Sequence, residues 1–295
     1  MSTFVWLIRR EFWENRGFWL VPSLIAALLL LGALFGRIDL AGIVPPSQTR
    51  EVGGLVLFAF GVIFFLVMSL YSTWYLVDCL YADRKDRSVL FWKSLPISDT
   101  ATVLSKLATA LIVLPLVYFL AADITTLLIA FVISVRARAA IGGALWQADV
   151  WLQLQVMWIY LIVTVGIWYL PLAAWLMLIS AWAKRAVTLW AILPPVAAYW
   201  AEHALFGTNF VGRQFMERLF GFMPHAFHPH AGPLRLQGAT VGTASATDRF
   251  LGSGSVWTLL DPIGFFTSPA TWAGLAIGAL LIVATIGIRS RNSEI

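Results

Sequence analysis

Six apolar stretches of roughly 20 residues run through this 295-residue chain and limit the folds that it can adopt. Inside a bilayer every backbone polar group must find its partner within its own segment, so stretches of this length predict membrane-spanning helices. The expected spans cover residues 18–35, 55–77, 107–135, 156–181, 186–206 and 269–288. The sequence therefore predicts an all-α membrane protein with six transmembrane helices, folded as a single domain over residues 1–295.

The low content of charged residues excludes a soluble enzyme. Apolar residues make up 60% of the chain and charged residues only 12%, while the mean hydropathy is +0.83. Soluble domains carry about 25% charged residues, because their surface must face water. Most of the surface of this protein is therefore expected to face lipid.

The distribution of basic residues predicts the orientation. Lysine and arginine near the ends of spans favour the cytoplasmic side. If the N-terminus is cytoplasmic, the pieces on that side hold 12 of the 20 basic residues and every lysine: Arg9, Arg10, Arg16, Arg84, Lys85, Arg87, Lys93, Lys106, Lys184, Arg185, Arg289 and Arg291. We expect both termini in the cytoplasm. The basic residues form no continuous stripe, so nucleic acid is not an expected partner.

Residues 1–17 resemble a helix that lies in the headgroup layer. Phe4, Val5, Ile8 and Phe12 fall within about 100° on a helical wheel, the width of an apolar face, although Glu11 interrupts it. The residues expected at the membrane interface are Trp6, Arg9, Arg10, Trp13 and Arg16. Tryptophan and arginine suit that layer, where membrane lipid is the partner. The alternative is an extension of the first span into water.

The connection 78–106, between the second and third expected spans, contains a charged cluster followed by large aromatic side chains. Its segment ADRKDRSVLFWKSLPISD, residues 82–99, predicts a short helix over 83–92 that ends before Pro96, after which Ser98 or Asp99 caps the third span. Such a helix could seat in a groove on a soluble partner. A solvated loop with interfacial aromatics is the alternative. The residues concerned are Asp83, Arg84, Lys85, Asp86, Arg87, Phe91, Trp92 and Lys93.

The segment 207–268 is expected on the extracytoplasmic side. Residues 211–222 could form an amphipathic helix, and residues 256–266 could dip back toward the membrane. His225, His228 and His230 form the one cluster with metal-binding side chains, because imidazole suits copper, zinc or nickel. A group of interfacial histidines that binds no metal is the competing interpretation and is the one we favour.

Ionisable residues within spans are costly and therefore point to function. Asp123 lies deep in the third expected span, close to Thr126, where it could line a polar path or pair with an arginine across a helix interface. Glu202, near the outer end of the fifth expected span, is a further candidate for the path, although water can reach it there.

Three short stretches resemble a known family. RREFWENRGFW at 9–19, SVLFWKSLP at 88–96 and VLSKL at 103–107 are similar to bacterial ABC transporter permeases of the type-2 export class. The resemblance rests on sequence motifs in the first 120 residues and on topology alone in the remainder. It implies an N-terminal interfacial helix, a cytoplasmic coupling helix over residues 84–93, re-entrant helices before the last span and a location in the bacterial inner membrane. It also implies two partners: a second permease copy, and two copies of a separate ABC ATPase subunit.

The motifs of common enzymes are missing from the sequence. There is no Walker A pattern G-x-x-x-x-G-K-[ST], no H-E-x-x-H and no G-x-S-x-G. We expect this chain to bind no cofactor and to be no enzyme, with ATP and magnesium held by the partner subunit. An ATP-independent channel or scaffold remains the first alternative, and an intramembrane enzyme that uses Asp123 or the histidines is the second.

Overall fold

The computed structural model describes residues 3–36, 49–85, 98–136, 144–227 and 259–291. Within these ranges the chain is helical, apart from a single bridge between Phe227 and Leu260. Five helical segments of the described chain are long and apolar enough to cross a membrane, namely Gly17–Phe35, Val56–Lys85, Asp99–Arg136, Ala148–Trp168 and Pro269–Arg291. The protein is therefore a multi-pass, all-α membrane protein, as the sequence predicts.

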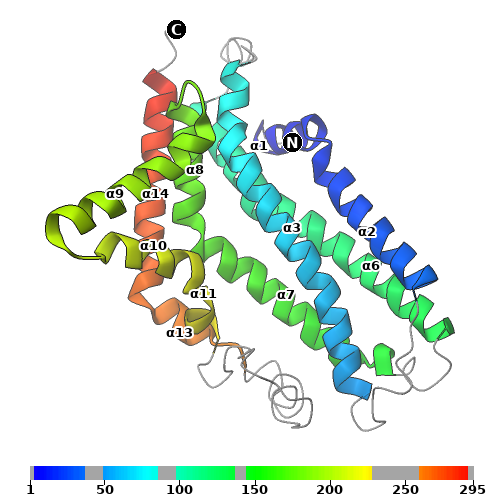
Figure 1. Ribbon diagram of the computed structural model, residues 1–295. Coiled ribbons are helices and arrows are strands. Elements are labelled where there is room, and N and C mark those ends of the chain that lie inside the picture. The colour runs from blue at the N-terminus through cyan, green and yellow to red at the C-terminus, as the bar shows by residue number, and fades with distance from the viewer. Residues whose placement is uncertain (1–2, 37–48, 86–97, 137–143, 228–258, 292–295) are drawn as a thin grey trace.

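The first helices meet at a sharp angle. Helix α1 (Thr3–Glu14) ends at a turn over Asn15 and Arg16, after which α2 (Gly17–Phe35) begins. Figure 1 shows α1 lying across the end of the bundle, beside the last turns of α3. The alternative of one continuous extension of the first span is therefore wrong. We call this end of the bundle, where α1 and the end of α14 lie, the network end.

Helix α3 (Thr49–Lys85) is a single helix of 37 residues. It continues well past residue 77, where the sequence analysis ends the second span. Asp83, Arg84 and Lys85 consequently form its last turn and do not begin a separate helix. Residues 86–97 lie outside the described residues, so Asp86, Arg87, Phe91, Trp92 and Lys93 have no described position.

The third span is built from three consecutive segments, α5 (Asp99–Ala108), the π-helical turn η2 (Thr109–Val113) and α6 (Leu114–Arg136). The Ser98 side chain accepts a hydrogen bond from the backbone N–H of Ala101 and caps α5, which confirms the expected cap. The wide turn comes directly before Pro115, which cannot donate to the carbonyl four residues earlier. The hydroxyl of Ser72 donates to the Ala110 carbonyl inside that turn, at 3.1 Å.

The fourth expected span, residues 156–181, is wrong as one continuous helix. The structure has α7 (Ala148–Trp168) and α8 (Leu170–Trp182) with a break at Tyr169, where ψ is 3°. Pro171, at the second position of α8, lacks the N–H that would continue the ladder of α7. Helix α8 then packs along α14 (Pro269–Arg291).

The chain returns toward the start of α14 through helices of different length. Helix α9 (Val187–Phe206) carries Pro194 and Pro195 and is not among the five candidate spans, so the fifth expected span, residues 186–206, stays a prediction. It runs obliquely in Figure 1 and is followed by the short helices α10 (Phe210–Phe220), α11 (Phe222–Ala226) and α13 (Pro262–Thr267). The amphipathic helix expected over 211–222 thus corresponds to α10, and α13 overlaps the end of the expected segment 256–266.

Candidate functional site: a buried charge network

A lysine and a glutamate form the centre of the network end. Nζ of Lys106, on α5, lies 2.8 Å from Oε1 of Glu11, on α1, and 3.3 Å from Oδ1 of Asp83, on α3. Glu11 is 1% exposed, Lys106 2% and Asp83 8%. Charges this deeply buried need partners, because a carboxylate or ammonium left alone in low dielectric is strongly destabilising. Three helices are therefore held together by ionic contacts.

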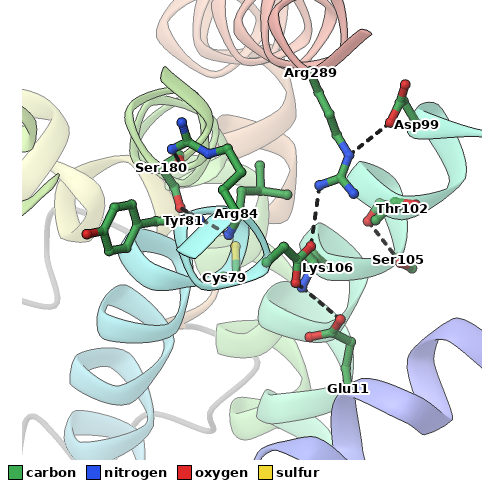
Figure 2. Close-up of polar contacts among 12 residues, drawn as sticks. Glu11, Cys79, Tyr81, Arg84, Asp99, Thr102, Ser105, Lys106, Ser180 and Arg289 are labelled. Atoms are coloured by element: carbon green, nitrogen blue, oxygen red, sulfur yellow. Dashed lines mark hydrogen bonds and ion pairs between the residues drawn. The ribbon is translucent and has the colours of Figure 1, made fainter. Parts of the chain in front are cut away.

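Arg289 extends this network to α14. Its Nη1 lies 3.4 Å from Oδ2 of Asp83, and its Nε donates to Oδ1 of Asp99 at 3.0 Å. Figure 2 shows Arg289 reaching down to Asp99 while Lys106 points to Glu11. Asp83 lies near the end of α3 and Asp99 begins α5, so one guanidinium connects residues that stand shortly before and after the segment 86–97 in the sequence. We call Glu11, Asp83, Asp99, Lys106 and Arg289 the charge network.

Two further groups surround Glu11. The hydroxyl of Tyr75, on α3, donates to Oε2 of Glu11 at 2.7 Å, and Nη2 of Arg10 lies 2.7 Å from Oε1. Burial by itself raises the pKa of the Glu11 carboxyl, but the charge of Lys106, the hydrogen bonds from Lys106 and Tyr75, and the charge of Arg10 together hold its pKa below 4.5. Glu11 is therefore a carboxylate at neutral pH.

Arg84 joins α3 to a fifth helix, α8, beside the charge network. Its Nη2 donates to the carbonyls of Ser180 and Ala183, the latter at 2.8 Å, at the end of α8. Free carbonyls and the negative end of the helix dipole favour a cation there. The Ser180 hydroxyl in turn accepts from the backbone N–H groups of Leu80 and Tyr81. Figure 2 shows Arg84 and Ser180 on the side of α3 away from Lys106.

The residues expected to contact an ATPase are thus divided by the structure. Asp83 and Arg84 point into the protein and bind other helices, whereas Lys85 is exposed. Asp83 and Arg84 thus contact other helices of this chain, and contact with an ATPase stays a prediction.

The residues expected at the membrane interface behave in two ways. The guanidinium of Arg9 lies over the rings of Trp6 and Trp13, at 5.1 and 4.6 Å from their centroids, and all three side chains are exposed. Arg16 is exposed too, but Arg10 turns inward to Glu11. The protein-facing side of α1 centres on Leu7 and Glu11, so the glutamate that interrupts the apolar face is the residue that anchors the helix.

Asp123 and Thr126 line one pocket between α3, α6 and α7. The Asp123 carboxylate accepts a hydrogen bond from Nε2 of Gln155, on α7. Among the described residues no arginine pairs with it. Glu202 lies elsewhere: its carboxylate accepts from Thr208 and from the backbone N–H groups of Phe210 and Val211, which lowers its pKa and caps α10.

His225 is part of the packing around the break between α7 and α8. Its ring lies 4.8 Å from that of Trp168, its Nδ1 is 3.3 Å from the Ser268 hydroxyl, and its Nε2 is 3.6 Å from Oε1 of Glu217. His228 and His230 lie outside the described residues. In the part of the chain that is described, no group of three potential metal ligands comes together.

The sequence analysis did not identify Glu11, Lys106, Asp99 and Arg289 as one site. The sequence does contain a signal for buried charge. Lys106 stands next to the start of the third expected span, and Glu11 stands in the apolar face of the first helix. What the sequence cannot show is that these charges, far apart along the chain, meet at one end of the bundle.

Comparison with models of protein families, with curated proteins and with solved structures finds no match for this chain.

Proposed function

We propose that this chain is the transmembrane subunit of an ATP-driven exporter in a bacterial inner membrane, with ATP hydrolysis carried out by two copies of a separate ATPase subunit. A second copy of the chain completes the transporter. The cargo crosses between spans that move when the ATPase subunits close. The network end faces the cytoplasm in this proposal.

The charge network is the observation that supports this proposal best. Arg289 binds Asp83 and Asp99, which flank the segment 86–97. Lys106 binds both Asp83 and Glu11 and so links these residues to α1. A force on that segment would therefore act at once on α1, α3, α5 and α14. A transport subunit without a nucleotide site needs such a link, because the free energy released in a partner must reach its spans.

The location of the charges also favours movement over simple stabilisation. Replacing a buried ion pair by apolar residues of similar volume is often neutral or stabilising, so an ionic cluster is a poor device for rigidity alone. Ion pairs can exchange partners, as at subunit interfaces that switch between two arrangements. Five charges shared among four helices give such exchange several possible partners.

Co-purification tests the proposal. The full chain, extracted in mild detergent from its own host, should retain an ATPase subunit, and the double substitution Phe91→Ala with Trp92→Ala should release it. Phe220→Ala with Phe266→Ala is the matched control, since these exposed aromatics lie on α10 and α13. A wild-type chain that never retains an ATPase would refute the proposal, and loss of the partner in the control would show that the contact is unspecific.

Orientation gives a second, independent test. In a Cys79→Ser background, which removes the one native cysteine, a cysteine placed at Ser88 should react with an impermeant maleimide only from the cytoplasmic side. Arg37→Cys, in the connection after the first span, should react only from the opposite side. Labelling of Ser88→Cys from outside intact cells would overturn the proposed coupling.

A further inference from the structure

One pocket lies in the middle of the bundle, away from the charge network. It has a volume of about 40 Å³ and is bounded by α3, α6 and α7. At roughly 10–15 Å³ for each water, this is space for about three waters. A group of three or four heavy atoms would fill it, which is the size of a small polar head and not of a whole drug-like molecule.

Six of the 16 residues that line the pocket are aromatic. Trp158 lies flat against α3, with its ring stacked on Phe58 at a centroid distance of 5.2 Å and near Phe65 at 6.1 Å. Gly61, between these two on the same helix face, makes this approach possible, because a Cβ there would stand 2.3 Å from the Trp158 ring. Phe119 and Trp151 also line the pocket.

Polar groups converge on this aromatic wall from α6 and α7. The Asp123 carboxylate has room for about four hydrogen bonds, and among the described residues Gln155 supplies one. Tyr118 also lines the pocket; its side chain is 1% exposed, and no described group is within hydrogen-bonding reach of its buried oxygen. The Asp123 carboxylate therefore keeps room for hydrogen bonds from a ligand.

The Asp123 carboxylate makes the pocket suited to a cationic ligand. None of the described residues that line it is basic, so the Asp123 carboxylate in the bundle interior has no cationic protein partner there. Metal ions of the Ca²⁺ and Mg²⁺ class require six or more oxygen ligands, which an aromatic wall does not supply. An organic ammonium fits both features, because it donates hydrogen bonds to the oxygens and is attracted to the ring faces.

We propose that the pocket formed by Tyr118, Asp123, Gln155 and Trp158 binds the protonated amine of an amphiphilic molecule. The ammonium donates to the Asp123 carboxylate, while the ring of Trp158 covers it. The hydrocarbon part of the ligand lies outside the pocket, among the apolar helices. The assignment of this molecule as cargo rests on the proposed transport function; the binding itself does not.

Equilibrium binding of radiolabelled octylamine to the purified full chain in a non-ionic detergent tests the pocket. We expect one site, for which unlabelled octylamine competes and octanol does not. Asp123→Asn should weaken binding by about tenfold or more, and Trp158→Leu by about fivefold, because it removes the aromatic ring over the ammonium. Glu202→Gln, which removes a carboxylate outside the pocket, should bind like the wild type.

Two outcomes would overturn the inference: equal binding by the wild type and Asp123→Asn, or equal competition by octanol. Trp158→Leu keeps the test decisive should Asp123→Asn fail to fold. Repeating the measurement in bilayers of phosphatidylglycerol, with and without phosphatidylethanolamine, separates the sources of the amine. Competition by phosphatidylethanolamine identifies a lipid head group, and lack of competition identifies a free amphiphile. No ATPase is present in these measurements, so their failure leaves the proposed transport function standing.

Discussion

The two ends of α14 are each held by an arginine, but with opposite chemistry. At the network end Arg289 is bound to two carboxylates that belong to α3 and α5. At the other end Arg218, on α10, donates to the backbone carbonyls of Ala270 and Trp168, at 2.8 and 3.3 Å, and its guanidinium lies 4.4 Å from the centroid of the Trp168 ring. Burial lowers the pKa of Arg218, whose described partners are chiefly neutral.

This difference separates a part that can rearrange from a part that is fixed. Carboxylates on several helices can exchange a cation with only small movements, and the charge network contains three of them. Backbone carbonyls at a helix break and the face of one indole accept a guanidinium in a single geometry. We infer that the network end is the adjustable end of the bundle and that Arg218 anchors the other end.

The largest expected effect follows from removing the central cation. Lys106→Met removes the cation that the buried carboxylates of Glu11 and Asp83 share, so the free energy of unfolding should fall by about 3–5 kcal/mol. Thermal and denaturant unfolding in detergent, followed by tryptophan fluorescence, measures it. Lys184→Met is the control, because that lysine is exposed in the turn between α8 and α9 and its loss should cost under about 0.5 kcal/mol. Equal stability of the two variants would show that the ionic contacts do not hold this end.

A smaller loss is expected at the anchored end. Arg218→Met removes two charged hydrogen bonds and the contact with Trp168, so we expect about 2–3 kcal/mol of destabilisation. Arg213→Met, an exposed arginine on the same helix, should change stability little. If Arg218→Met proved more damaging than Lys106→Met, the division into an adjustable and a fixed end would have to be reversed.

Acid should weaken the network end before the anchored end. Because the pKa of Glu11 is lowered in the folded protein, its contribution is complete above about 4.5 and is lost as the pH falls through the folded-state pKa. The difference in unfolding free energy between the wild type and Glu11→Gln should therefore be constant near neutral pH and shrink well below 4.5. A difference that stays unchanged in acid would argue against a lowered pKa.

The smallest expected effect tests whether the contact of Arg218 with the start of α14 stabilises the protein. In Gly274→Ala the new Cβ would stand 2.2 Å from Nη2 of Arg218, which would have to leave the Ala270 carbonyl at a cost of about 1 kcal/mol. Gly287→Ala in the same helix meets nothing within 4 Å and should be neutral or stabilising. In an Arg218→Met background the cost of Gly274→Ala should vanish, and a cost that persists would locate the clash elsewhere.

Much of the bundle could be predicted from the sequence, because apolar stretches of this length have few alternatives to a helix. The cap at Ser98 and the interruption after α1 follow from local chemistry and are confirmed. The break at Tyr169 was missed, although Pro171 marks it. Its stability depends on Arg218, which supplies a donor to the Trp168 carbonyl from 50 residues away, and no local pattern contains that contact.

The candidate sites show the same limit. Asp123 was singled out because a carboxylate in a span is costly, yet its partner Gln155 and the buried hydroxyl of Tyr118 are ordinary residues in an apolar sequence. Arg84 and Asp83 were expected to face a partner protein, since charges near a span end usually face water. Their burial depends on the ends of α8 and α14, which tertiary packing brings to them.

The π-helical turn Thr109–Val113 lies on the one helical rod that contains both Lys106 and Asp123. A turn of this kind holds one residue more than an α-helical turn, and each residue of an α-helix accounts for about 100° of rotation and 1.5 Å of rise. Converting it to α geometry, with Lys106 held in place, would swing the far half of the rod through about that angle and carry Asp123 away from Gln155. The hydrogen bond from the Ser72 hydroxyl to the Ala110 carbonyl stabilises the π-helical turn and would have to break in that change.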